Sequence, residues 1–325
     1  MLNLFRKVKS IHSEFRLAIS QINEIFVTTQ SDAVNKSHQS KLNELTLLPG
    51  GPYSTVALPL DYSPSRNLNP RWGYSHPPIP QIASWLNQYQ SDYLSFVSDM
   101  FSNRPNIATH YDESNPTSPS WFGGAICTFD SLALYTMVKL SKPTRYVEIG
   151  SGMTTLFAKK AVDDFGLKTK IVSIDPQPRQ FVDSVCDEIE RCALENLDLD
   201  YFDSLESGDI LFLDGSHRSF MNSDVTVFFI DLLPRLKPGV IIHIHDITLP
   251  FDYPESFKHW YWNEQYLLAV YLMGHLKKCI PIAPTAWMCR NEEISKSISK
   301  LHFDFGDTAS NESWFGGGSF WFTQS

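Results

Sequence analysis

The second half of the chain most constrains its fold, because short β-rich runs alternate there with helical segments from Arg145 onward. The runs stay apolar almost to their last residues, which is typical of a parallel sheet covered by helices on both faces. The alternation therefore predicts a doubly wound α/β fold. The β-rich runs are RYVEIG, KIVSID, DILFLD and VIIHIHD, and the helical segments are 153–165, 179–192, a segment ending at LLPRLKPG, and 257–275.

Carboxylates lie at or next to the ends of these four runs. They are Glu148, Asp175, Asp214 and Asp246. Because ligands of doubly wound sheets bind beyond the carboxyl ends of the strands, we expect all four side chains to border a ligand site.

The turn after the first run, YVEIGSGMTT, has glycines at positions 150 and 152. Glycine lets the backbone approach a ligand closely at a strand-to-helix turn. A nicotinamide-binding turn would carry a third glycine where this chain has Thr155, so an NAD-linked oxidoreductase is the weaker alternative. Asp175 follows Gly152 at a spacing that suits hydrogen bonds to ribose hydroxyls. The turn therefore predicts a nucleoside cofactor.

The motifs VEIGSG, SIDPQP, ILFLDGSH and LKPGVIIHIHD, in this order, resemble those of class I S-adenosylmethionine-dependent methyltransferases over about residues 121 to 321. The resemblance implies a Rossmann-like, seven-stranded doubly wound sheet with an N-terminal helical extension, and S-adenosylmethionine as the cofactor. It leaves the adenine contact unassigned. By position it implies that the cofactor is bound by Glu148, Gly150, Ser151, Gly152, Asp175 and Asp214.

Further motifs, DGSH, HDI, FDYP and YWNEQYLL, are similar to those of a bacterial family within this superfamily. Its relatives act on sugars, polysaccharides and secondary metabolites. The resemblance therefore implies a methyltransferase whose partner is a small-molecule or glycan acceptor. An O-methyltransferase is expected because of the arrangement of candidate base and metal ligands described next. A non-catalytic scaffold that keeps the fold is the alternative from another class.

A hydroxyl is a poor nucleophile and needs a base, or a metal ion that lowers its pKa. We expect His217 to be the base, with His245 as second choice and Asp246 beside it. Asp214, His245 and Asp246 are the candidate ligands of a divalent cation such as Mg²⁺ or Mn²⁺, although imidazole suits softer metals than magnesium. His243 lies deeper in its strand, and we expect a core histidine with a hydrogen-bond partner.

Three further residues are candidates for contact with the acceptor. Asn263 and Glu264 are polar residues in an aromatic-rich segment, and the resemblance places WNEQ near the substrate. A solvated helical face is the alternative for both. Trp121 precedes the first strand and is a candidate for the mouth of the site, with core packing as the alternative.

The pattern along the chain divides it into three parts. Residues 1–27 carry apolar residues at alternating steps of four and three, which predicts an amphipathic helix for packing or for homo-oligomerisation. Residues 28–115 are expected to form a linker, a proline-rich wrap and a helix at 81–101 that cover the acceptor site. Residues 116–325 are expected to form the methyltransferase domain.

Composition narrows the partners and the compartment. A formal net charge of -9 argues against a nucleic-acid partner. No apolar run is long enough to predict a transmembrane segment. The five cysteines are scattered without paired spacing, which favours a cytoplasmic protein.

Overall fold

The computed structural model describes residues 69–107, 115, 117–122, 126–178, 182–258, 260–303 and 316–325. The chain divides into two compact units, Met1–Asn69 and Pro70–Ser325, and all described residues except Asn69 belong to the second. The helix predicted at 1–27, its role in oligomerisation and the linker that follows it lie outside the described residues.

A seven-stranded sheet forms the centre of the second unit, with the strand order β3-β2-β1-β4-β5-β7-β6. Neighbouring strands are parallel except where β7 pairs with β5 and β6, so the sheet is mixed. The predicted doubly wound fold is thus confirmed. The strands are β1 Arg145–Ile149, β2 Lys170–Ile174, β3 Glu188–Glu190, β4 Ile210–Leu213, β5 Ile241–Ile244, β6 Cys279–Pro284 and β7 Phe320–Gln324.

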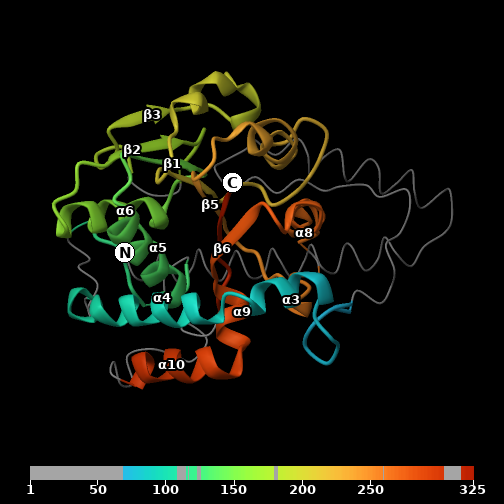
Figure 1. Ribbon diagram of the computed structural model, residues 1–325. Helices are drawn as coiled ribbons and strands as arrows, with labels where there is room; N and C mark the ends of the chain where they lie inside the picture. Colours follow the sequence, from blue (N-terminus) through green and yellow to red (C-terminus); the bar gives the residue numbers. More distant parts are fainter. Residues whose placement is uncertain are drawn as a thin grey trace, which may run out of the picture. The chain divides into compact units, whose positions relative to one another are not determined.

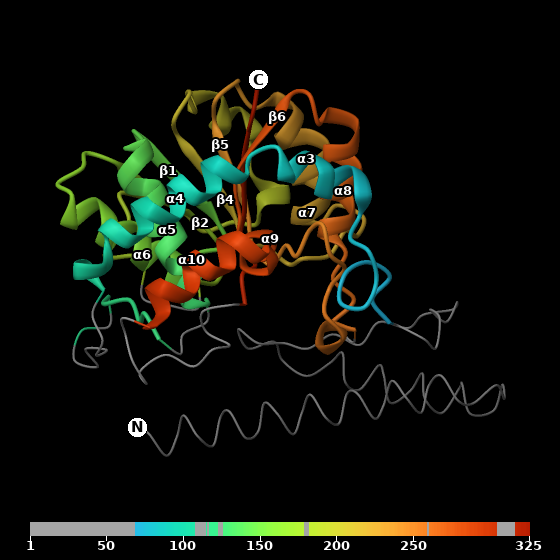
Figure 2. The ribbon, with the colours of Figure 1, turned by 60° about the horizontal axis from the view of Figure 1, so that its bottom comes forward.

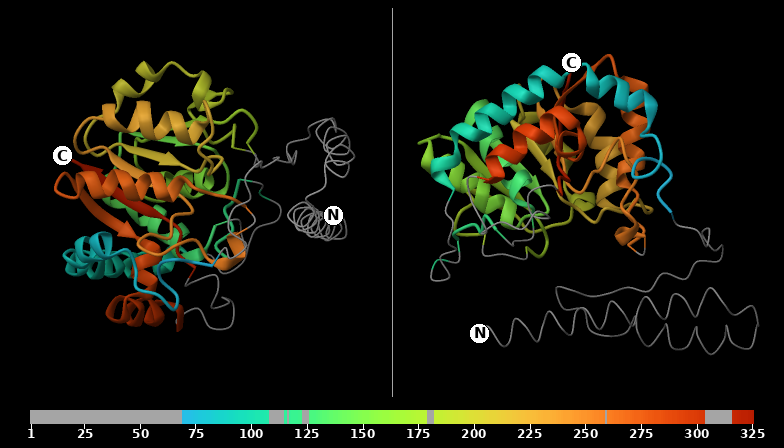
Figure 3. Two further views of the ribbon diagram at one scale, coloured as in Figure 1. Left: turned by 90° about the vertical axis from the view of Figure 1, so that its right-hand side faces the viewer. Right: turned by 90° about the horizontal axis from the view of Figure 1, so that it is seen from below.

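Helices cover both faces of the sheet (Figure 3). The α-helices are α3 Pro80–Asn87, α4 Gln90–Ser102, α5 Thr128–Ser141, α6 Met153–Asp164, α7 Asp224–Val227, α8 Glu264–His275, α9 Thr285–Arg290 and α10 Glu292–Phe303. Single turns and short helices of other types are η1 Arg104–Asn106, η2 Leu194–Asn196, η3 Leu199–Ser204, η4 Phe228–Leu232, η5 Leu233–Arg235 and η6 Glu255–Phe257.

The two faces of the sheet are packed by two separate hydrophobic clusters. Residues of α3, α7 and α8 pack on one face, and residues of α4, α5, α6 and α10 pack on the other. Helices α4 and α10 lie side by side, as do α3 and α8 (Figures 1 and 2). Within β1, Tyr146 contributes to one cluster while Val147 and Ile149 contribute to the other. This alternation explains why the strands are apolar along their whole length.

The described residues differ from the sequence prediction in three elements. The helix predicted at 81–101 is two helices, because α3 ends at Asn87 and α4 begins at Gln90. The segment predicted as a helix at 179–192 instead contains β3, next to which Asp187 bonds Ile171 of β2 through both its backbone and its side chain. The helix predicted from residue 257 begins only at Glu264, since Tyr261 has a φ of 54°, which a right-handed helix does not allow.

Residues 80–102 precede the expected methyltransferase domain, yet they pack into the same two clusters as the sheet. Within the described residues, no helix combines the length and apolar character needed to cross a membrane.

Candidate active site

The turn between β1 and α6 packs directly against the end of β4. Gly150 has a φ of +84°, and a Cβ added to it would lie 1.8 Å from the backbone oxygen of Asp214. Its N–H donates to the carbonyl of Ile174 at 3.0 Å, which ties the turn to β2 as well. The first glycine of the motif is therefore required by the protein's own packing.

Gly152 differs from Gly150, because a Cβ added there would meet no atom within 4 Å. Gly152 stands just before α6, and its N–H donates to the hydroxyl of Thr155 at 3.0 Å. The space beside this glycine is open, so the backbone at the start of α6 is accessible to a ligand.

Asp175 follows β2 and is fixed by two backbone N–H groups. One carboxylate oxygen accepts from Ser151 at 2.8 Å and the other accepts from Gln177 at 2.7 Å. Each oxygen keeps capacity for another hydrogen bond. The partly exposed carboxylate can therefore still accept bonds from hydroxyl groups of a ligand beside the glycine turn.

Glu148 is completely buried below the turn and accepts a hydrogen bond from the hydroxyl of Thr154. Burial raises the pKa of its carboxyl group to about 8, although hydrogen bonds from Thr154, Thr155 and Tyr146 act in the opposite direction. The nearby negative charge of Asp214 raises the pKa further. The side chain is therefore mostly uncharged at pH 7.

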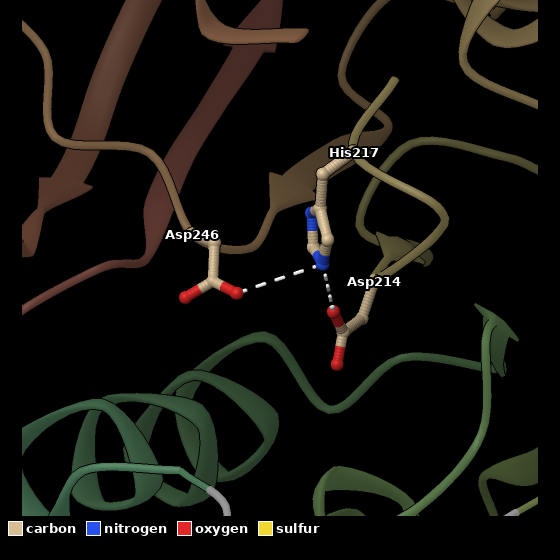
Figure 4. Close-up of side chains that lie close together, drawn as sticks. All are labelled: Asp214, His217 and Asp246. Atoms are coloured by element: carbon tan, nitrogen blue, oxygen red, sulfur yellow. Dashed lines mark ion pairs between the residues drawn. The ribbon is translucent and has the colours of Figure 1, made fainter. Parts of the chain in front are cut away.

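Asp214, His217 and Asp246 come together at the carboxyl edge of the sheet, after β4 and β5 (Figure 4). Nε2 of His217 lies 3.5 Å from Oδ1 of Asp214 and 3.6 Å from Oδ2 of Asp246. One potential ligand atom from each residue lies within 4.8 Å of the other two. His217 and Asp246 also have left-handed φ values of 62° and 55°. Such backbone strain is concentrated at functional sites.

The imidazole of His217 is held on its far side by Glu264, whose Oε1 lies 2.5 Å from Nδ1. The indole of Trp262 packs on the same ring with 4.1 Å between centroids. Burial alone would lower the pKa of His217, but the carboxylates of Glu264, Asp214 and Asp246 together raise it to about 9. The imidazole is therefore oriented with Nε2 toward the two aspartates.

His245 also lies close to the same two aspartates. Its Nδ1 lies 3.5 Å from Oδ1 of Asp246 and 3.7 Å from Oδ1 of Asp214. Burial lowers its pKa, yet the charges of Asp246, Asp214 and Asp130 raise it to about 10. The three residues whose potential ligand atoms all lie within 4.8 Å of one another include His217, whereas the sequence suggested His245 as the third metal ligand.

His243 is fully buried between aromatic rings, stacked on Phe212 at 3.6 Å and beside Trp321 at 4.3 Å between centroids. Neither ring nitrogen has a hydrogen-bond partner among the described residues, so the partner predicted from the sequence is wrong. Burial, and then the nearby His245, hold its pKa well below the usual range. Aromatic stacking accommodates a neutral imidazole at this position.

Asn263 and Glu264 both bind the loop that carries His217. The side-chain oxygen of Asn263 accepts from the N–H of Ser219 at 2.7 Å, and its own N–H donates to the carbonyl of His217 at 2.9 Å. Glu264 is fully buried. Trp121 is buried as well and packs edge-on against Tyr135 and Phe157.

Asp130 was not singled out from the sequence, but it connects three distant segments behind the site. Its buried carboxylate accepts from Thr285 Oγ1 at 2.5 Å, from the N–H of Gly318 at 2.7 Å and from that of Ser319 at 3.3 Å. The carbonyl of Gly318 then accepts from the N–H of Ile247 at 2.8 Å, directly after Asp246. The pentapeptide SWFGG, which the sequence has at residues 120–124 and again at 313–317, gives no indication of this carboxylate.

Comparison with known proteins finds a family match over this part of the chain. Residues 147–247 match the model of a family described as a methyltransferase domain. The SAH-bound methyltransferase PaMTH1 of Podospora anserina is similar at 15% identity and a TM-score of 0.34, over 57% of this chain and 81% of that one. Mycolic acid cyclopropane synthase CmaA1, complexed with SAH and CTAB, is similar at 11% identity and a TM-score of 0.29, over 71% and 95%. No curated protein matches the chain.

The matched residues run from within β1 to just past Asp246, so they include the glycine turn, Asp175 and the cluster after β4 and β5. Over residues 147–247 the chain is therefore similar to a methyltransferase domain.

Proposed function

We propose that this methyltransferase methylates a hydroxyl of a glycan, a polysaccharide or a glycosylated metabolite, with assistance from a divalent cation. The observation that carries the proposal is the convergence of Asp214, His217 and Asp246 within 4.8 Å at the edge of the sheet. β4, which Asp214 follows, is the direct neighbour of β1, so this cluster adjoins the glycine turn.

The donor half of the site would be formed by the turn after β1. Gly152 leaves open space for the ligand, and the preorganised carboxylate of Asp175 can accept hydrogen bonds from its ribose. Glu148 supports the turn from below through Thr154. S-adenosylmethionine supplies an activated methyl group, so the protein has to align the acceptor and exclude water.

The donor set fits a divalent cation. Two carboxylates and one imidazole suit Mn²⁺ and similar ions better than they suit Mg²⁺, which prefers oxygen ligands only. The other nitrogen of His217 is bonded to Glu264, and metal-ligating histidines are typically oriented by such a carboxylate. A bound cation would lower the pKa of a hydroxyl that contacts it.

In the transfer, the sulfur–methyl bond breaks while the oxygen–methyl bond forms, and the hydroxyl loses its proton. The aspartates are the accessible members of the cluster, with side chains 33% exposed at Asp214 and 28% at Asp246, whereas His217 is almost buried. We assign the contact with the acceptor to these carboxylates, through which the proton leaves to water. His217, held by Glu264, fixes the geometry of the cluster through an imidazole that is neutral when the cation is bound, and His245 balances part of the charge of the two aspartates.

Transfer of a labelled methyl group from S-adenosylmethionine to a panel of oligosaccharides and glycosides tests the proposal. We expect label in an O-methyl ether, loss of activity on chelation and recovery with Mn²⁺. Asp246→Asn should reduce transfer at least about a hundredfold, since it removes a charged ligand, while Asp231→Asn on the exposed surface should keep full activity. Label on nitrogen or carbon, or full activity of Asp246→Asn after chelation, would contradict the proposal.

A further inference from the structure

Two large apolar side chains stand exposed three and four residues after His217. Phe220 is 47% exposed and Met221 is 98% exposed. Isolated exposed apolar residues are common on proteins and need no explanation. This pair, which we call the apolar tip, differs in that hydrogen bonds hold the backbone of Phe220 and in that both residues belong to the loop that carries His217.

The backbone of the apolar tip is fixed by hydroxyl groups. The carbonyl of Phe220 accepts from Thr226 Oγ1 at 2.5 Å, and its N–H donates to Ser223 Oγ at 3.1 Å. Asn222 completes the turn with a φ of 54°. A surface held in one conformation loses little entropy when it binds a ligand. The backbone turn that presents the two side chains is therefore preorganised for contact.

The base of the same loop is bound to the segment that packs on His217. Arg218 Nε donates to the carbonyl of Trp260 at 2.9 Å, and Ser219 N–H donates to Asn263. Trp262 lies between Trp260 and Asn263 in the sequence and packs on the ring of His217. The rings of Trp260 and Trp262 lie 4.5 Å apart between centroids. Trp262 thus places apolar surface next to the imidazole, in the segment to which the base of the loop is hydrogen-bonded.

We propose that the apolar tip binds an apolar group of the acceptor, namely the aglycone of a glycoside, next to the hydroxyl that is methylated. The inference rests on the proposed function and narrows it from glycans in general to glycosides with an apolar aglycone. A free polysaccharide, which is hydrated on all sides, would gain nothing from Met221.

Two other occupants fit the tip less well. Residues 219–224, SFMNSD, contain no lysine or arginine, whereas surfaces that bind anionic membranes are rich in both. A stable protein interface buries roughly 800 Å² on each partner, which is more than two side chains provide. The position of the tip beside the active site favours the acceptor itself.

The test compares methyl and octyl glycosides of several hexoses, below the micelle concentration of the octyl forms, by calorimetric titration of the protein saturated with S-adenosylhomocysteine. We expect the octyl glycosides to bind about tenfold more tightly, which is the order expected for covering the surface of one apolar side chain. The double variant Phe220→Ser, Met221→Ser should lose this preference. The matched control Val270→Ser, Met273→Ser removes side chains that are 68% and 44% exposed on α8, and it should keep the preference.

Equal binding of the paired glycosides to the wild-type protein would overturn the inference, as would an octyl preference that survives in the tip variant. Loss of binding to phosphatidylcholine vesicles in that variant, without a change in glycoside preference, would assign the tip to a membrane instead. Methyl transfer with the same glycosides separates the two proposals. An octyl preference without any transfer to oxygen would contradict the proposed function while leaving the apolar site in place.

Discussion

His217 illustrates how far single residues could be assigned from the sequence. Its position after an apolar strand marked it as a candidate, but its partner Glu264 lies 47 residues further along the chain. Only the fold brings the two together. Without that contact the sequence could not show whether His217 is a general base or a metal ligand held in one orientation. It also could not show which histidine, His217 or His245, joins Asp214 and Asp246 in the cluster.

Glu264→Gln tests the orientation of His217. We expect the variant to fold, because glutamine still offers an oxygen to Nδ1, but to bind Mn²⁺ about ten to a hundred times more weakly, as for other carboxylates behind metal-binding histidines. Titration of the purified proteins with Mn²⁺, followed by electron paramagnetic resonance, gives the affinities. Glu255→Gln on the exposed η6 turn serves as the control, and equal affinity of all three proteins would remove Glu264 from this role.

At the scale of elements, the strands were predictable because a buried parallel sheet requires continuous apolar runs, and β1, β2, β4 and β5 have them. β3 and β6 were not, since β3 is the short charged segment EIE and β6 contains two prolines. The start of α8 was missed for another reason. The aromatic residues before it have the spacing of a helix, but the left-handed backbone at Tyr261 ends any helical path there.

The turn between β1 and α6 gives a paired prediction. Gly150→Ala should destabilise the protein by several kcal/mol, because the new Cβ would collide with the backbone of Asp214 at a left-handed φ. Gly152→Ala should leave stability almost unchanged, since its Cβ meets open space, but should weaken binding of S-adenosylhomocysteine. Urea unfolding and calorimetry measure the two effects. A stable Gly150→Ala protein, or wild-type cofactor affinity in Gly152→Ala, would contradict this account of the turn.

At the scale of the whole molecule, a single compact unit from Pro70 onward carries the candidate site at the carboxyl edge of the sheet, where the sequence predicts a ligand site. The edge was predictable because it depends only on strand direction. The contacts that shape it were not, as Asp130 shows, because that carboxylate joins α5 to residues more than 150 positions away. These contacts follow from packing between elements, which local sequence patterns do not encode.

The buried Glu148 should make global stability depend on pH. Its folded pKa of about 8 lies above the ordinary glutamate pKa of 4.5, so between these values the folded protein retains a proton that the unfolded chain has lost. Stability of the ligand-free protein should therefore fall as pH rises through this window, by at most about 1.4 kcal/mol per pH unit. Urea unfolding at pH 5.0 and 6.5 should show a fall of up to about 2 kcal/mol that is reduced in Glu148→Gln and unchanged in Glu206→Gln. Identical pH dependence in all three proteins would contradict a raised pKa.

The most direct test of the central claim is a calorimetric titration with S-adenosylhomocysteine, followed by Mn²⁺, on the chelated wild-type protein and on Asp175→Ala and Asp246→Asn. We predict binding of S-adenosylhomocysteine on the order of micromolar to the wild-type protein and to Asp246→Asn, and about tenfold weaker binding to Asp175→Ala, which loses a charge-assisted hydrogen bond. Mn²⁺ should bind the wild-type protein and Asp175→Ala but not Asp246→Asn. Failure of the wild-type protein to bind S-adenosylhomocysteine would contradict the assignment of the donor site, and Mn²⁺ binding that is unchanged in Asp246→Asn would contradict the proposed cation site.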